Sequence, residues 1–106
     1  MAITIQQDSA HAVTISVAGQ FDHSIKTELQ KGIASLEKVM CYYFDFGRTS
    51  KLHSTGVGLL IDIRQQLGGA RANISLQNCS EEIMRVLKQA GLLPLFTVQP
   101  ALAQPA

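Results

Sequence analysis

The chain alternates between segments with an apolar period of two and segments with a period near 3.6, and this pattern most restricts its fold. Positions 3–5 and 13–17 alternate apolar with polar or small residues, which is typical of strands with one buried face. Residues 8–11 are predicted to turn between them. Apolar residues at helical spacing follow at 25–36, 57–67 and 83–90. The pattern therefore predicts a hairpin followed by alternating helices and strands.

Capping signals place the ends of these helices. The first helix is predicted over residues 24–37, with Asp22 or Ser24 capping its free amides. The second is predicted over residues 55–67, where Gly68 and Gly69 can adopt a left-handed cap. The third begins after Ser80, which precedes the segment EEIMRVLKQAG.

The remaining strands are predicted from their apolar and aromatic content. MCYYFDF, residues 40–46, is interpreted as a central strand buried on both faces. Residues 70–78 alternate again, and LFTV, residues 95–98, is short enough for an edge strand. The predicted fold is α/β: a single domain over residues 1–99, with helices packed on a mixed, mostly parallel sheet and a frayed tail over 100–106.

Composition excludes several classes of function. The chain has 106 residues, 46% of them hydrophobic and 16% charged, which suits one compact domain. A formal charge of +1 without a basic stripe argues against a nucleic-acid partner. Without an apolar run of about 18 residues, we expect no direct membrane insertion and a cytoplasmic location. The two cysteines show neither metal-type pairing nor a disulfide framework.

The segment KLHSTGVGLL, residues 51–60, places two hydroxyls at the start of the second helix. Ser54 or Thr55 can simply cap that helix. Alternatively, Gly56 and Gly58 keep the first turn free of side chains, so that the Ser54 hydroxyl stays accessible as a phosphoacceptor. Neither a hydrolase elbow nor a nucleotide-binding glycine loop surrounds it, which argues against catalysis.

The stretch FDFGRTSKLHSTGVGLLIDIRQQLGG resembles the central motif of the STAS family, which includes bacterial anti-sigma factor antagonists. VAGQFDHSIKTELQKGI and SEEIMRVLKQAGLLPLFTV resemble the flanking segments of that family. The resemblance implies a non-enzymatic switch without a cofactor. It implies that the unmodified form binds an anti-sigma factor serine kinase or related regulator, and that phosphorylation of the motif serine, here Ser54, releases it. It also implies a cognate phosphatase that removes the phosphate.

One position departs from the resemblance. Asp22 and Asp45 match aspartates of the family pattern, whereas His53 stands where antagonists usually carry an aspartate before the phosphorylated serine. The departure keeps a second interpretation open, a constitutive STAS subunit of a membrane transport complex. Binding of a small ligand at the helix start is a third. The expected partner surface comprises Asp22, His23, Ser24, His53, Ser54, Thr55, Gly56, Val57 and Gly58.

Overall fold

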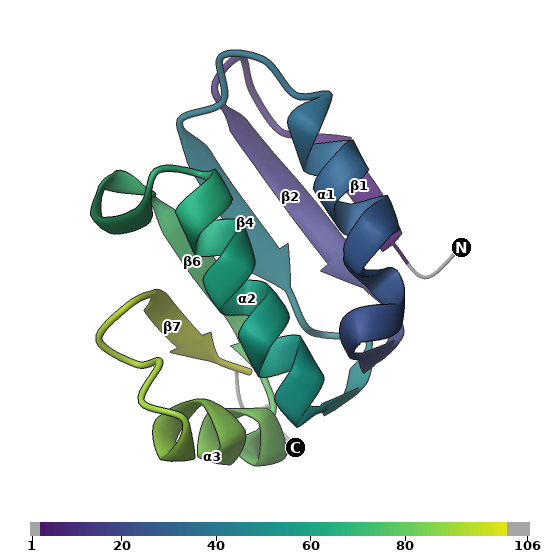
Figure 1. The fold of residues 1–106 in the computed structure, drawn as a ribbon, viewed down its shortest axis with the longest axis vertical. Helices are drawn as coiled ribbons and strands as arrows, with labels where there is room; N and C mark the ends of the chain where they lie inside the picture. Colours follow the sequence, from purple (N-terminus) through teal and green to yellow (C-terminus); the bar gives the residue numbers. More distant parts are fainter. Residues whose placement is uncertain (1–2, 102–106) are drawn as a thin grey trace, which may run out of the picture.

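A computed structural model describes residues 3–101 and shows a five-stranded sheet with two helices across one face (Figure 1). The strand order is β1-β2-β4-β6-β7. The first two strands pair antiparallel as the predicted hairpin, and all other neighbours in this sheet pair parallel. The mixed, mostly parallel sheet is therefore confirmed. Its strands are β1 (Ile3–Gln7), β2 (Ala12–Val17), β4 (Cys41–Asp45), β6 (Ile74–Cys79) and β7 (Thr97–Pro100).

The three predicted helices are present, with ends set by local chemistry. Ser80 caps the third helix by accepting a hydrogen bond from the Ile83 N–H at 3.2 Å. Gly68 follows the second helix with φ 117°, a conformation that suits glycine. The first helix is shorter than predicted. The elements are η1 (His23–Ile25), α1 (Lys26–Ala34), α2 (Ser54–Gln66), η2 (Gly69–Arg71) and α3 (Glu81–Gln89).

A second, two-stranded sheet was not predicted from the sequence. It pairs β3 (Gly19–Phe21) in parallel with β5 (Thr49–Leu52). The Gly19 N–H donates to the Arg48 carbonyl at 3.0 Å. The buried Thr49 hydroxyl donates to the Val17 carbonyl at 2.6 Å and so ties β5 to the end of β2. Because β5 ends just before α2, this small sheet positions the start of that helix.

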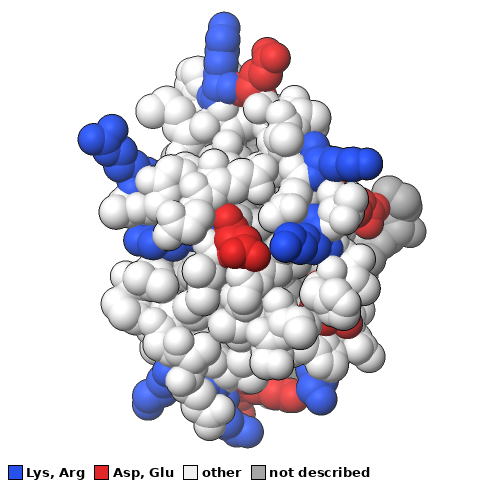
Figure 2. Space-filling view, viewed as in Figure 1, with Lys and Arg blue, Asp and Glu red and all other residues white. Residues whose placement is uncertain are grey.

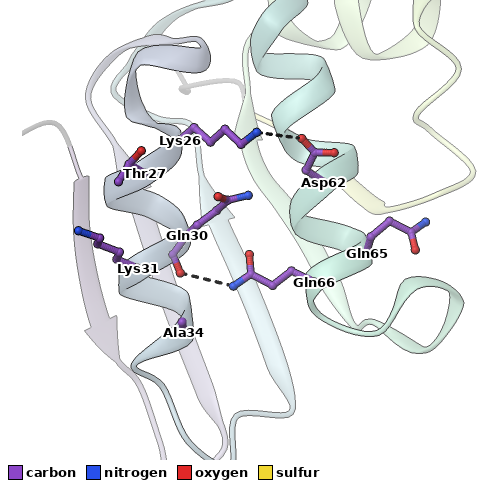
Figure 3. A pocket seen from close by; sticks show the side chains of 8 residues that line it. All are labelled: Lys26, Thr27, Gln30, Lys31, Ala34, Asp62, Gln65 and Gln66. Carbon is purple, nitrogen blue, oxygen red and sulfur yellow. Dashed lines mark hydrogen bonds and ion pairs between the residues drawn. The ribbon is translucent and has the colours of Figure 1, made fainter.

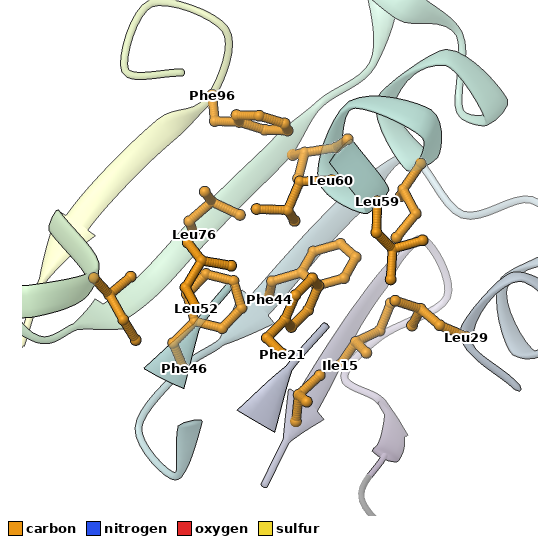
Figure 4. Close-up of a cluster of buried hydrophobic side chains, with 14 of the residues drawn as sticks. Ile15, Phe21, Leu29, Phe44, Phe46, Leu52, Leu59, Leu60, Leu76 and Phe96 are labelled. Carbon is orange, nitrogen blue, oxygen red and sulfur yellow. The ribbon is translucent and has the colours of Figure 1, made fainter. Parts of the chain in front are cut away.

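The core lies between the main sheet and the helices (Figure 4). Ile15, Phe44 and Leu76 face one another across β2, β4 and β6, and all three are fully buried. Leu29 of α1 and Leu60 of α2 are buried with them, so each helix contributes its apolar side to one cluster. Burying such side chains is worth about 1.5–3 kcal/mol each.

The prediction that residues 40–46 are buried on both faces was wrong. The helices α1 and α2 lie across one face (Figure 1), and Tyr43 and Asp45, which alternate away from that face, are half-buried. Ser16 and Gln77 flank Asp45 on the neighbouring strands. A sheet with an antiparallel hairpin at one edge can leave a polar face to solvent, and the tyrosines suit a half-buried surface.

The final strand lies two residues later than predicted, at Thr97–Pro100. The Ala101 N–H donates to the Cys79 carbonyl at 2.8 Å, so the last described residue is still attached to β6. The rest of the predicted frayed tail, residues 102–106, lies outside the described residues. Between residues 3 and 101, every helix is too short or too polar to cross a membrane.

Candidate functional site

The start of α2 is held in place by the small sheet. His53 precedes the helix in extended conformation, with φ −84° and ψ 163°. Its N–H donates to the Phe21 carbonyl of β3 at 3.1 Å, and its carbonyl accepts from the Val57 N–H at 3.0 Å. The backbone therefore changes from strand pairing to helical pairing at His53. Ser54 is the first helical residue.

The two hydroxyls at this helix start have different surroundings. Neither bonds to a first-turn amide of α2, so the predicted cap is wrong. The Thr55 hydroxyl accepts from the His23 N–H at 3.2 Å and so joins α2 to η1. Ser54 is exposed, and within residues 3–101 its hydroxyl has no hydrogen-bond partner. Ser54 is therefore the hydroxyl that another protein can reach without breaking a bond.

Asp22 places a negative charge at the same end of the molecule. Its carboxylate caps η1 by accepting from the Ser24 N–H at 3.0 Å, which confirms the predicted cap, and also accepts from the Ser24 hydroxyl. The hydrogen bond from the Ser24 side chain, and next that from its backbone, lowers the pKa of Asp22 below 3.8, whereas desolvation raises it by less than either of these. Electrostatic interaction with His53 and His23 also lowers the pKa of Asp22. Asp22 is therefore ionised at neutral pH.

The His53 side chain has a partner of its own. Its Nε2 lies 2.8 Å from Oε1 of Gln20 on β3. An amide oxygen only accepts hydrogen bonds, so it is the tautomer with a proton on Nε2 that makes this contact a hydrogen bond. The imidazole therefore joins β3 to the start of α2 and stays half-buried beside Ser54.

The two glycines of the first turns do different things. Gly56 is buried, and a Cβ there would lie 2.7 Å from the Phe21 Cδ1 and 2.9 Å from the Phe21 carbonyl carbon. Gly56 therefore permits the close approach of α2 to β3. Gly58 is exposed, and a Cβ there would meet nothing within 4 Å. It leaves open surface beside the half-buried Val57.

A shallow groove of about 450 Å³ opens directly beside Ser54, and the sequence did not predict it. It lies between the start of α2 and the end of α3, where Val86 and the C-cap residue Ala90 stand four positions apart. Lys51 is its one fully charged side chain. Its lining comprises Lys51, Leu52, His53, Ser54, Val57, Val86, Gln89 and Ala90.

A second groove, of about 860 Å³, runs between α1 and α2 (Figure 3). It is polar: Lys26 lies 3.9 Å from Asp62, and the Gln66 side chain donates to the Gln30 carbonyl at 3.4 Å. Figure 2 shows that the helical face is largely uncharged, with single charged side chains of both signs scattered over it. Neither groove carries a patch of one charge.

Asp45 has hydrogen-bond partners of its own. It accepts hydrogen bonds from the Gly47 N–H at 2.8 Å and the Asn78 side chain at 2.9 Å, which holds the turn after β4. The two aspartates that match the family pattern thus hold different parts of the backbone, Asp22 the start of η1 and Asp45 the turn after β4. Within residues 3–101, no group of three His, Cys, Asp or Glu side chains is placed to hold a metal ion.

Comparisons with known proteins agree with this geometry. The family model described as STAS domain matches residues 2–104. A STAS-domain containing protein of Pseudomonas aeruginosa is 30% identical over 92% of this chain and 99% of its own length.

Solved structures agree as well. The anti-sigma factor antagonist SpoIIAA in its unphosphorylated form has a TM-score of 0.77 and 24% identity over 92% of this chain and 87% of that one. The phosphorylated form of SpoIIAA from Bacillus has a TM-score of 0.66 and 25% identity, covering 92% and 90%. A sulfate transporter family protein of Wolinella succinogenes has a TM-score of 0.76 and 13% identity, covering 89% and 80%.

Proposed function

The chain belongs to the STAS domain family, and we propose that it is a phosphorylation-controlled interaction module of the anti-sigma factor antagonist kind, with Ser54 as the phosphoacceptor. The observation that carries the proposal is the exposed Ser54 hydroxyl at the start of α2, which has no hydrogen-bond partner within residues 3–101. The neighbouring Thr55 hydroxyl is already engaged by η1. The protein itself performs no chemistry.

The surface around Ser54 suits a protein partner. The apolar part of the adjoining groove, with Val57 and Val86, can receive an apolar side chain, while Asp22 presents a charge nearby. In its unmodified form the chain binds an anti-sigma factor serine kinase or a related regulator through this surface. The contact residues are the partner surface expected from the sequence, around Asp22 and Ser54, together with Val86 and Gln89 of α3.

Phosphorylation acts through charge at this interface. A phosphate on Ser54 adds about −1.5 to −2 charges at neutral pH. The domain tolerates it because the positive end of the α2 dipole and free first-turn amides lie beside it. A partner fitted to a neutral hydroxyl and to the ionised Asp22 then meets a second, larger negative charge, which releases it. A phosphatase reverses the step.

His53 modifies this switch. In place of an aspartate, the loop carries an imidazole, which removes one negative charge from beside the phosphate. Because Nε2 bonds to Gln20, the second ring nitrogen is the one free for the Ser54 phosphate. His53→Ala is expected to shorten the lifetime of the phosphorylated form, measured by intact mass during incubation with phosphatase. An unchanged lifetime and unchanged partner affinity would contradict this role.

The proposal is tested on protein isolated from its native cells. Wild type, Ser54→Ala and Ser54→Glu are compared by intact mass, peptide mapping and identification of bound proteins. Ser50→Ala is the matched control, because Ser50 is also exposed and lies on the preceding strand. We expect phosphate on Ser54 only in the fraction without partner, constant binding for Ser54→Ala and lost binding for Ser54→Glu.

A constitutive subunit of a membrane transport complex is the second candidate, favoured by His53 in place of the usual aspartate. Such a subunit packs on a transport ATPase irrespective of modification. An unmodified Ser54 under every growth condition, with one membrane complex bound equally by wild type, Ser54→Ala and Ser54→Glu, would refute the switch and support this alternative.

A further inference from the structure

The two edges of the main sheet differ in how they are protected. The edge strand β7 contains Pro100, which has no N–H, and its pairing with β6 shifts between Leu76 and Cys79. Proline and irregular pairing are common means of preventing a free edge from joining another strand. The opposite edge strand β1, ITIQQ, contains no proline, glycine or charged residue and pairs with β2 in regular register. The β7 edge is therefore protected against pairing with a further strand, whereas the β1 edge is not.

Backbone hydrogen bonding identifies which β1 groups are free. The Asp8 N–H donates to the Ala12 carbonyl at 2.9 Å, which continues the register in which Ile3 faces Val17. Antiparallel strands alternate hydrogen-bonded and non-hydrogen-bonded pairs. Positions 4, 6 and 8 therefore bond to β2, and positions 3, 5 and 7 direct their N–H and C=O groups to the outer edge.

We propose that β1 is the association edge for a second copy of this chain. The two strands pair antiparallel about a twofold axis at Ile5, so that Ile3 of each copy faces Gln7 of the other. The outward groups of these positions then bond to one another, and the two sheets become one. This inference is independent of the function proposed for Ser54.

Geometry and charge favour a second copy in this place. No element of residues 3–101 lies outside β1 in Figure 1, and α1 packs above it, where Gly32 lies close to the Ile5 side chain. Ile5 is half-buried, and the Ile5 side chain of the second copy covers its exposed part. No charged residue faces another across the paired strands, and a net charge of +1 adds little repulsion.

The contact is small. Each copy contributes a strand of only five residues, whereas a stable interface buries roughly 1,200 Å² or more, so we expect a weak and transient dimer.

Sedimentation equilibrium of the full chain, from about 10 µM to about 2 mM, measures the association. Gln7→Pro removes an outward N–H without removing a bond to β2, and Gln7→Ala is the matched control that keeps the N–H. We expect Gln7→Pro to raise the dissociation constant at least about tenfold over Gln7→Ala. Monomers throughout the concentration range, or equal association of the two variants, would overturn the proposal.

Hydrogen exchange of the wild-type chain decides the question if Gln7→Pro fails to fold. The Thr4 and Gln6 amides should be protected at every concentration because they bond to β2. The Ile5 and Gln7 amides should become protected only as the concentration rises. Dimers without this alternation would place the contact elsewhere and refute the proposed edge.

Discussion

Replacing Gly56 with alanine should destabilise the chain, although alanine is the better helix former. A Cβ at this position would lie 2.7 Å from Cδ1 and 2.9 Å from the carbonyl carbon of Phe21. The carbonyl belongs to β3, which also accepts the His53 N–H, so it cannot move without loosening the start of α2. The Phe21 ring is fully buried and in edge contact with Phe46, at 5.5 Å between centroids. Relief therefore requires α2 to move away from β3.

The expected magnitude follows from two opposing effects. Overpacking of this kind costs about 1–3 kcal/mol. Replacing glycine by alanine inside a helix stabilises that helix by about 0.5–1 kcal/mol. Gly56→Ala should thus lower the free energy of unfolding by roughly 1–2 kcal/mol. Gly58→Ala is the control: its Cβ meets nothing within 4 Å, so the helix preference alone should raise stability by about 0.5–1 kcal/mol.

Urea and thermal unfolding, followed by circular dichroism, measure both variants against wild type. A difference of about 1.5–3 kcal/mol between them corresponds to roughly 6–24 °C in melting temperature for a chain of this size. Equal stability of Gly56→Ala and Gly58→Ala would refute the close packing of α2 on β3. A stabilised Gly56→Ala would refute it as well.

Three further predictions concern single side chains. Thr49→Val removes a buried hydrogen bond to a β2 carbonyl and should lower the free energy of unfolding by about 1–3 kcal/mol, measured by urea titration. Asp22 should titrate below 3.8 by carboxyl-carbon NMR, and Ser24→Ala should raise its pKa, because Ser24 is the main cause of the shift. Since the folded-state pKa is the lower one, this interaction stabilises the fold above the unfolded-state value and is lost as the pH falls through the folded-state value. Burial, and secondarily Asp45, raise the pKa of the Cys79 thiol to about 11, so a maleimide at pH 8 should modify Cys41 first, as peptide mapping would show.

The elements that the sequence predicted correctly depend on local patterns. The hairpin, the central strand and three helices are visible because each buries one side, and a buried side imposes a period on its own residues. The strands β3 and β5 have three and four residues, too few to show a period. Their stability comes from pairing with each other, as in the bond from Gly19 to Arg48. The pattern of apolar and polar residues within one short segment does not show which distant segment pairs with it.

Some features of the candidate site were likewise predictable from the sequence, and others were not. That a serine stands at the head of an apolar helix, with small residues after it, is a property of adjacent positions and was predictable from the sequence. Which hydroxyl is free was not, because Thr55 is engaged by His23, 32 positions away. The groove beside Ser54 likewise exists only because α3 brings Val86 next to α2.

The sequence by itself determined the order of most elements, the place of Ser54 near the start of a helix and the amphipathic side of each helix, because local periodicity and capping act over a few residues. Tertiary structure alone decided which sheet face stays open, which glycine is indispensable and which edge strand is unblocked. These properties depend on how distant segments pack. An apolar pattern shows that one side of a helix or strand is buried, but it does not show which segment buries it.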